Sequence, residues 1–395
     1  MPADRILDFM TSRHEALRAV RRDIHQHPEL GFQEFRTAGR VADRLRELGY
    51  DVHTGVGRTG VVGILYGHGD NGRSIGLRAD MDALPIREEP GLEYESVHPG
   101  VMHACGHDGH TTILLGAAEY LAATRNFSGR VVLIFQPAEE GLGGAQAMID
   151  DGLFERFDCD EIYALHTWPG LPAGTVGVNP GPMMAAADRF DVLIEGRGGH
   201  GAHAYQTRDP VVIAAHLITA LQTIVSRNVA GPEAAVLTVS AVQAGNLDAM
   251  NVIPGQARLV GTVRTFSPET QRLVKDRMGT IIGGIGAAFD ARITMNYHYL
   301  FPATINTARH ASTVAQVAAQ LLGHDHVVPD LSPSMGSEDF SYMLAQRPGA
   351  YFRLGQGGAD NDRVLHSPHF DFNDDVIPVG CAMFARLVEH SSPLA

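Results

Sequence analysis

The chain has 395 residues, with 31 Lys or Arg, 45 Asp or Glu and 20 His, and its formal net charge is −14. This length predicts two to three domains of roughly 150 residues with a large core, and the acidic balance argues against a nucleic-acid partner, which requires a basic surface. Three widely spaced cysteines, no signal peptide and no uninterrupted apolar run of about 18 residues lead us to expect a cytoplasmic protein without a membrane partner.

Helices and short apolar runs alternate over the first half of the chain. Helical stripes fit a segment that ends near residue 30 and the segments 34–48, 110–124 and 143–151. The runs between them predict strands at Gly60–Leu65, Ser74–Arg78, Val131–Phe135 and Glu161–Leu165. Strands that alternate with helices are typical of an α/β sheet.

The middle of the chain has a different order of elements. Strands are predicted at Arg189–Glu195, Ala235–Val242, Ala257–Phe266 and Ala291–Tyr299. Asp209-Pro210 and Ser267-Pro268 begin helices that end near Arg227 and Phe289, each with a capping residue before a first-turn proline. The resulting β-α-β-β-α-β order is that of a ferredoxin-like α+β unit.

The remaining chain predicts helices at 309–322, 337–346 and 375–390 and a strand at 350–354. We therefore expect a discontinuous α/β catalytic domain, residues 1–185 and 300–395, with an inserted α+β domain at 186–299. The glycine motif 67–72 matches G-x-G-x-x-G, but it lies between two predicted strands and precedes no helix. We interpret it as a hairpin turn rather than a dinucleotide-binding loop.

The densest chemical signal is the segment HACGHDGH at 103–110, directly before a predicted helix. Imidazole and thiolate groups are ligands for zinc and similar metals. Cys105 and His107 are two residues apart, so both can face one ion from an extended turn. A polar loop without a metal is the weaker alternative.

Acidic and histidine residues follow several predicted strands. Asp80 and Asp82 share a face after one strand, and Glu139-Glu140 and His166 follow two others. Each pattern alone also fits a solvated strand end or a core histidine. The core-histidine alternative applies to His366 and His369 in their loop as well. Asp80, Glu139, Glu140 and His166, however, all fall at the carboxyl ends of predicted strands, the edge where open α/β sheets bind ligands.

At these residues the sequence resembles the M20 family of metallopeptidases and amidohydrolases, in the branch of hippurate hydrolases, N-acyl-L-amino acid amidohydrolases and hydrolases of auxin (IAA)–amino acid conjugates. Nearly the whole chain takes part, from RRDIHQHPEL (21–30) and GLRADMDALP (76–85) through HACGHDGH and FQPAEEG to GSEDF (336–340) and LHSPHFDFND (365–374). The resemblance implies a zinc-peptidase-like catalytic domain whose insertion serves as lid and dimerisation domain.

The resemblance also implies roles for individual residues. The expected ligands of two divalent ions are Cys105, His107, Glu140, His166 and His366. Glu139 matches the catalytic base and Asp82 the acid that orients a ligand, whereas Asp80 replaces a metal-binding histidine of the wider family. In the insertion, His200 matches an oxyanion-binding residue that reaches the partner subunit, and Asn251 and Arg264 match groups that hold the substrate carboxylate.

The expected activity is metal-dependent hydrolysis of the amide bond in N-acyl-L-amino acids, such as hippurate-like or N-acetyl substrates. Alternatives are a dipeptidase or carboxypeptidase of the same family, an N-acetyl-diaminopimelate deacetylase, and a non-enzymatic metal-binding protein. Mixed ligation is compatible with Mn²⁺ or Zn²⁺, and with Co²⁺ or Ni²⁺. We expect a homodimer formed through the insertion, or a higher oligomer.

Overall fold

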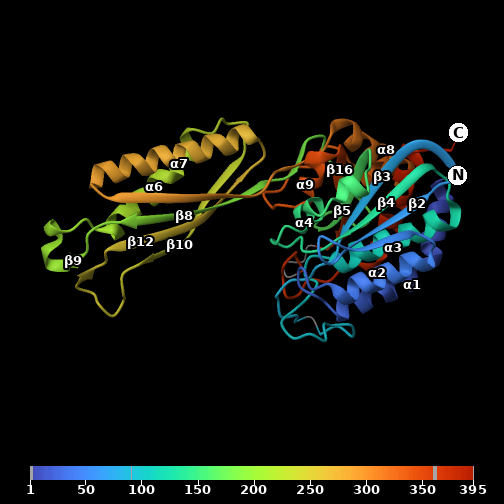
Figure 1. Cartoon of the computed structure of the whole chain (residues 1–395), viewed down its shortest axis with the longest axis horizontal. Coiled ribbons are helices and arrows are strands. Elements are labelled where there is room, and N and C mark those ends of the chain that lie inside the picture. The colour runs from blue at the N-terminus through green and yellow to red at the C-terminus, as the bar shows by residue number, and fades with distance from the viewer. Residues whose placement is uncertain (1–2, 90, 359–362, 395) are drawn as a thin grey trace. The chain divides into compact units, whose positions relative to one another are not determined.

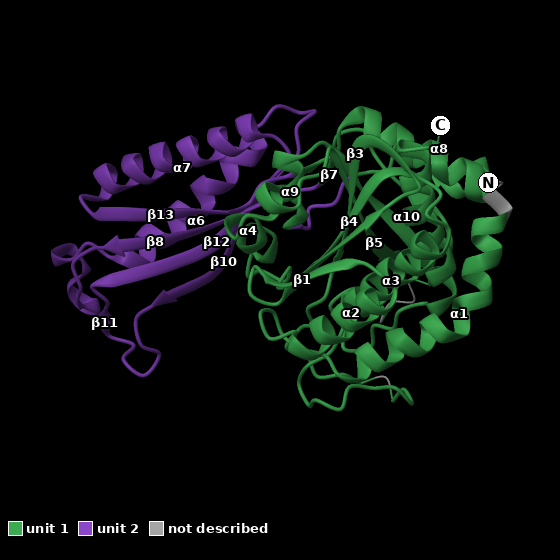
Figure 2. Cartoon of the chain, turned by 45° about the vertical axis from the view of Figure 1, so that its right-hand side comes forward, with its two compact units in different colours: residues 1–183, 304–332, 339–395 green, residues 184–303, 333–338 purple. Residues whose placement is uncertain are grey.

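The chain forms two compact units in a computed structural model that describes residues 3–89, 91–358 and 363–394 (Figure 2). Unit 1 comprises Met1–Met183, Thr304–Ser332 and Asp339–Ala395, and unit 2 comprises Met184–Ala303 and Pro333–Glu338. The predicted insertion, 186–299, lies within unit 2. This unit also includes residues 333–338, which were predicted to belong to the catalytic domain.

Unit 1 is built on an eight-stranded sheet with the order β1-β2-β4-β3-β5-β16-β6-β15 (Figure 1). Neighbouring strands β4, β3, β5 and β16 are parallel, so their carboxyl ends meet at one edge of the sheet. The strands of unit 1 are β1 (Asp51–Val56), β2 (Gly60–Tyr66), β3 (Gly69–Asp80), β4 (Ser128–Gln136), β5 (Glu161–Pro169), β6 (Val176–Gly177), β14 (Thr304–Ile305), β15 (Val327–Val328) and β16 (Gly349–Gly357), with β7 (Pro182–Met184) at the passage to unit 2.

The predicted hairpin at the glycine motif 67–72 is wrong. Strand β4 lies between β2 and β3, because Phe135 of β4 pairs with Val61 on one side and with Ala79 on the other. The chain therefore crosses the end of β4 before it begins β3, and Gly67 donates its N–H to the carbonyl of Gly129. The motif continues directly into β3 and opens no helix, as the sequence indicated.

Helix α3 is the central helix of unit 1 and is buried on nearly every side. Its sequence is almost free of charge after Asp108, which is typical of a fully enclosed helix. Helices α1 and α10 pack against it, and their apolar residues join one core with those of the sheet. The helices of unit 1 are α1 (Ala3–Gln26), α2 (Phe35–Glu47), α3 (His107–Thr124), α4 (Gly144–Asp150), α5 (Leu153–Arg156), α8 (Ala308–Leu322), α9 (Phe340–Gln346) and α10 (Ile377–Ser391), with short 3₁₀ helices η2 (His324–His326) and η3 (Asp374–Val376).

Unit 2 is an antiparallel sheet with the order β10-β12-β8-β13 and two helices that share a core with it. This strand order, with the chain order β-α-β-β-α-β, is the ferredoxin-like arrangement. A small two-stranded sheet of β9 and β11 extends from it. The elements are β8 (Ala186–Glu195), β9 (Gly199–His200), η1 (Gly201–Gln206), α6 (Pro210–Arg227), β10 (Ala235–Ala244), β11 (Val252–Ile253), β12 (Gln256–Thr265), α7 (Pro268–Phe289) and β13 (Arg292–Phe301).

Helix α6 corrects one expectation from the sequence. With 18 residues and a mean hydropathy of 1.3, this helix is long and apolar enough to cross a membrane by length and composition alone. The expectation rested on the absence of an uninterrupted apolar run, and the polar residues His216 and Gln222 interrupt the apolar sequence of α6. In the structure Ile213, Leu217 and Leu221 form a buried stripe that packs in the core of unit 2.

Candidate metal centre

The carboxyl edge of the parallel strands brings several polar side chains together. Strand β3 ends at Asp80, which is in register with Gln136 at the end of β4. Glu139 and Glu140 follow β4 by a few residues, and His166 lies in β5 near its end. Three neighbouring strands therefore deliver acid and imidazole groups to one side of unit 1, as the sequence pattern predicted.

The start of helix α3 delivers the thiol and another imidazole to the same edge. Gly106 has a φ of 90° and precedes the first helical residue, His107. A Cβ on Gly106 would lie 2.8 Å from Oγ1 of Thr167 on β5, so glycine is required there for both the turn and the close approach. Cys105 and His107 are thereby placed on either side of this turn, against β5 and β3.

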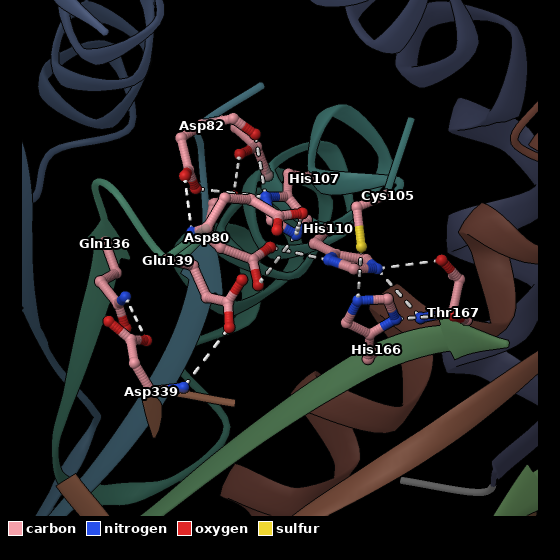
Figure 3. A network of polar contacts seen from close by, with 12 residues as sticks. Asp80, Asp82, Cys105, His107, His110, Gln136, Glu139, His166, Thr167 and Asp339 are labelled. Carbon is pink, nitrogen blue, oxygen red and sulfur yellow. Dashed lines mark hydrogen bonds and ion pairs between the residues drawn. The ribbon is translucent and has the colours of Figure 1, made fainter. Parts of the chain in front are cut away.

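The potential ligand atoms form overlapping groups in which all atoms lie within 4.8 Å of one another (Figure 3). The Cys105 Sγ is 3.3 Å from Nε2 of His166, and Nε2 of His366 is 3.3 Å from Oε1 of Glu140. That glutamate oxygen is 4.0 Å from Nε2 of His107. Four of these groups are Cys105–His107–His166, Cys105–Glu140–His366, His107–Glu139–Glu140 and Asp80–His107–His110. All five predicted metal ligands and Glu139 are thus brought together within unit 1.

Hydrogen bonds of the Nδ1 atoms fix the orientation of two imidazole rings, those of His107 and His166. Nδ1 of His107 lies 2.9 Å from the carbonyl oxygen of Asp82 and 3.2 Å from its Oδ1, and Nδ1 of His166 lies 2.7 Å from the carbonyl oxygen of Thr167. A carbonyl oxygen can only accept, so each Nδ1 donates its proton to a carbonyl and each Nε2 faces the cluster. Asp82 therefore holds the ring of His107, one of the predicted ligands.

The electrostatics of the cluster call for a cation. Burial, reinforced by the charges of Glu140, Glu139 and Asp80, raises the pKa of the Cys105 thiol well above its usual value. Burial disfavours charge on His107 as well, but the surrounding carboxylates, Asp80 first, raise the pKa of His107 to about 10. Without a metal, a proton on His107 partly balances these acids. A divalent ion would displace that proton and ionise the thiol.

Two buried ligand atoms, Nε2 of His107 and Oε1 of Glu140, make no well-aligned hydrogen bond among the described residues, although the Glu140 oxygen lies 3.3 Å from Nε2 of His366. Buried polar atoms without a partner are costly, and both atoms face the cluster. Thiolate, imidazole and carboxylate together suit borderline divalent ions. The donor set therefore fits a divalent-metal site.

Other polar residues of the HACGHDGH segment point elsewhere. Asp108 accepts from His25 and Arg21 in a buried network behind the cluster. The ring of His103 is fully buried there, and burial lowers its pKa to about 4. His110, by contrast, contacts Asp80 at 2.7 Å and belongs to the group that it forms with Asp80 and His107. His369 lies 3.9 Å from Glu89 and joins none of the ligand groups found among the described residues.

A buried network of hydrogen bonds next to the cluster was not predicted. Asp80 accepts from Arg78, which also donates to Asp339 on the segment that begins α9. Gln136 donates to the same Asp339, whose backbone N–H lies 3.4 Å from Oε1 of Glu139. The Arg78 and Asp80 side chains share a face at the end of β3, and this spacing of two was the available sequence signal. Asp80 thus has structural partners in addition to its contact, at 3.7 Å, with His107.

The three residues predicted in the insertion lie in unit 2. His200 is in β9, where its Nδ1 accepts the N–H of Ala202, and Val252 in the paired strand β11 directly follows Asn251. Arg264 is near the end of β12, opposite Ala187. Burial lowers the pKa of Arg264, although Asp188 opposes this effect, and Nη1 of Arg264 has no hydrogen-bond partner among the described residues.

Arg264 lies far from the other two residues within unit 2. Strand β12 runs from Gln256, beside the β9–β11 sheet, to Thr265, and Gln256 pairs with Glu195 at the end of β8 (Figure 1). The eight residue steps from Gln256 to Arg264 span about 27 Å at about 3.4 Å per residue. One copy of unit 2 therefore cannot bring Arg264 and Asn251 to the same carboxylate.

The sequence and the fold match known proteins over most of their length. The model of peptidase family M20/M25/M40 matches residues 76–390. A hippurate hydrolase from Campylobacter jejuni is 44% identical, covering 93% of this chain and 94% of its own, and an N-acetyl-L-cysteine deacetylase from Bacillus subtilis is 40% identical, covering 93% and 86%. A solved Bacillus subtilis structure, a dinuclear metal-binding peptidase of the M20 family, is 33% identical with a TM-score of 0.84, covering 97% of this chain and 99% of its own.

Proposed function

The chain belongs to peptidase family M20/M25/M40, and on this basis we propose that it hydrolyses the amide bond of N-acyl-L-amino acids. It is an amidohydrolase of that family. The observation that carries the proposal is the pair Glu139 and Glu140, which lie in one group with His107. In the proposal Glu140 is the ligand and Glu139 beside it is the base. A metal-storage or sensor protein would have no use for that second carboxylate.

The residues of unit 1 account for the proton transfers. Bound divalent ions supply a Lewis acid for the substrate carbonyl and lower the pKa of water. Glu139 accepts the proton of the attacking water as its oxygen bonds to the carbonyl carbon. Glu139 then donates this proton to the amide nitrogen as the C–N bond breaks. The products are a carboxylic acid and a free amino acid.

Unit 2 supplies the positive and polar groups in this proposal. Arg264 pairs with the free carboxylate of the substrate, for which its planar fork is suited, and Asn251 donates to the same group. His200 stabilises the oxyanion. Because Arg264 and Asn251 lie at opposite ends of the unit 2 sheet, we propose that a site takes Arg264 from its own chain and His200 with Asn251 from a second copy. The homodimer is therefore a functional requirement of the proposal.

We propose Mn²⁺ or Zn²⁺ as the physiological ions, two per subunit, with Co²⁺ or Ni²⁺ as substitutes. Each of the three cysteines is buried and free, which suits the reducing cytoplasm where we place the enzyme.

Kinetics on a substrate panel test the proposal. The metal-free protein is reconstituted separately with each metal and assayed with N-benzoyl, N-acetyl and indoleacetyl amino acids. Simple dipeptides and N-acetyl-diaminopimelate represent the alternatives. We expect the highest kcat/KM with N-acyl amino acids. Higher values with dipeptides would identify a peptidase instead, and no turnover with any substrate and metal would contradict the enzymatic assignment.

A further inference from the structure

Three strained backbone turns converge on one buried carboxylate in unit 1. Phe32, Arg58 and Ala138 are non-glycine residues in the left-handed region, with φ of 62°, 83° and 52°. Such conformations are unfavourable for residues with a Cβ and persist only where the surroundings hold them. Each of these turns is next to, or bonded to, the side chain of Glu34, which is 0% exposed.

The carboxylate of Glu34 accepts a hydrogen bond from each turn. Its Oε1 accepts the backbone N–H of Phe32 at 3.0 Å and that of Ala138 at 2.8 Å. Its Oε2 accepts the hydroxyl of Thr59, the residue after Arg58. One carboxylate thus joins the loop before α2, the β1–β2 turn and the loop after β4.

The bond to Ala138 is the one that matters for chemistry, because Ala138 directly precedes Glu139. On the other side of Glu139, the N–H of Glu140 donates to Oδ2 of Asp82 at 2.9 Å. The backbone N–H groups of both residues that flank Glu139 are therefore held by buried carboxylates. Burial raises the pKa of Glu34, and the negative charge of nearby Asp82 raises it further.

We propose that Glu34 is a positioning residue for the general base: by holding the N–H of Ala138, it keeps this residue in the left-handed turn that directs Glu139 toward the ligand cluster. The inference rests on the proposed function, because it takes Glu139 as the base. Glu34 itself touches neither the ligand atoms nor, in this proposal, the substrate.

The first test needs no activity. Amide hydrogen exchange is measured over residues 136–144 in the metal-free protein for wild type, Glu34→Gln, Glu34→Ala and Thr59→Val. Loss of a bond to a charged group should speed exchange at Ala138 by about tenfold or more in Glu34→Ala, and less in Glu34→Gln, whose neutral oxygen still accepts. Thr59→Val removes a bond to the other oxygen, so it serves as the matched control and should leave this segment unchanged.

The second test separates positioning from general stability. With metal restored and hippurate as substrate, kcat should fall by about tenfold or more in Glu34→Ala, with KM and metal content near wild type. Ala138→Gly removes the conformational cost of the left-handed turn. Adding it to either Glu34 variant should recover much of the lost kcat. Phe32→Gly relieves the equivalent strain at the turn that does not precede the base, so in the same background it should recover melting temperature but not kcat.

Three results would overturn the inference: unchanged exchange at Ala138 in both Glu34 variants, wild-type kcat in Glu34→Ala, or equal recovery of kcat by Phe32→Gly and Ala138→Gly. If Glu34→Ala does not fold, the graded effects expected for Glu34→Gln, with their reversal by Ala138→Gly, decide the matter. Parallel assay of Glu139→Gln distinguishes the two levels of failure. Full activity of Glu139→Gln would remove the base and hence the proposed mechanism, whereas an inactive Glu139→Gln beside a fully active Glu34→Ala would remove only the role of Glu34.

Discussion

The metal centre of unit 1 and the β9–β11 tip of unit 2 contrast in how their residues are held. In the centre, Asp80, Cys105 and His107 are 0%, 7% and 1% exposed, and His366 is the exposed member of the predicted ligand set. At the tip, His200 and Asn251 are exposed, and the neighbouring Leu247 and Met250 are almost completely accessible. The first region is complete within its own unit. The second presents its side chains outward.

This difference separates two kinds of functional residue. A buried ligand set is organised by the fold, because desolvated charges must be partnered wherever the chain places them. An exposed histidine and asparagine have no such constraint, so only contact with substrate or another surface gives them a role. Unit 1 should therefore be sensitive to loss of single charges, and unit 2 to loss of contacts made outside it.

The largest effect is expected from Glu139→Gln, within the buried region. It should retain the metal ions but lose between about a hundredfold and ten-thousandfold in kcat, because the proton acceptor is gone. Turnover and metal content are measured on the same sample. Glu140→Gln provides the contrast, since it should lose metal as well. A normal kcat with full metal content would exclude Glu139 as the base.

The buried charges of unit 1 should also make its stability depend on pH. Burial disfavours the charge on His25, but hydrogen bonds to Asp108 and Glu88 raise its pKa to about 9 from 6.5. The folded state then binds the extra proton more tightly, so the stabilisation is complete below pH 6.5 and is lost as pH rises through 9, amounting to about 3 kcal/mol. Denaturant titrations of the metal-loaded protein should show this loss in wild type and a flatter profile in His25→Gln. Parallel profiles would refute the assignment.

Mixed dimers test whether the tip acts on another subunit. Glu139→Gln and His200→Ala chains, each inactive alone, are unfolded and refolded together. Random pairing makes about half of the dimers mixed, and each mixed dimer has one intact site, so about a quarter of wild-type activity should return. Absence of recovery despite proven mixed dimers would mean that His200 acts in its own subunit or has no role in catalysis.

A smaller effect is expected for Arg264→Lys, because the charge is kept but the planar fork is lost. KM for hippurate should rise by about tenfold with a lesser change in kcat. Arg258→Lys, on the same strand but at an exposed arginine paired with Asp191, is the matched control and should resemble wild type. Equal KM values for all three proteins would remove Arg264 from carboxylate recognition.

Much of unit 1 could be predicted because its chemistry lies at strand ends. Asp80, Glu140 and His166 follow apolar runs, and parallel strands bring such positions to one edge. The prediction of a hairpin between β2 and β3 was wrong because nothing local in the sequence shows that β4 lies between them. The two-residue strands β6 and β15 also escaped prediction, since their pairing is set by neighbours distant in the chain.

The gathering of the predicted ligand residues could be foreseen from the sequence, but the residues that support them could not. The HACGHDGH segment suggested one cluster, yet His103 and Asp108 turn toward His25 and Arg21 instead. Glu34 gave no signal, because its role depends on backbone N–H groups supplied by loops far away in sequence. Polar partners of this kind become visible only once the chain is folded.

The position of β16 has a consequence for the order in which the protein can acquire its structure during synthesis. Strand β16 lies between β5 and β6, so the central sheet of unit 1 stays open until Gly349–Gly357 leave the ribosome. The intervening residues 184–303 contain the entire core cluster of unit 2, which can fold while β5 still has a free edge. An exposed edge strand is a template for aggregation. A nascent chain halted before Gly349 should therefore carry a folded unit 2 and an aggregation-prone unit 1.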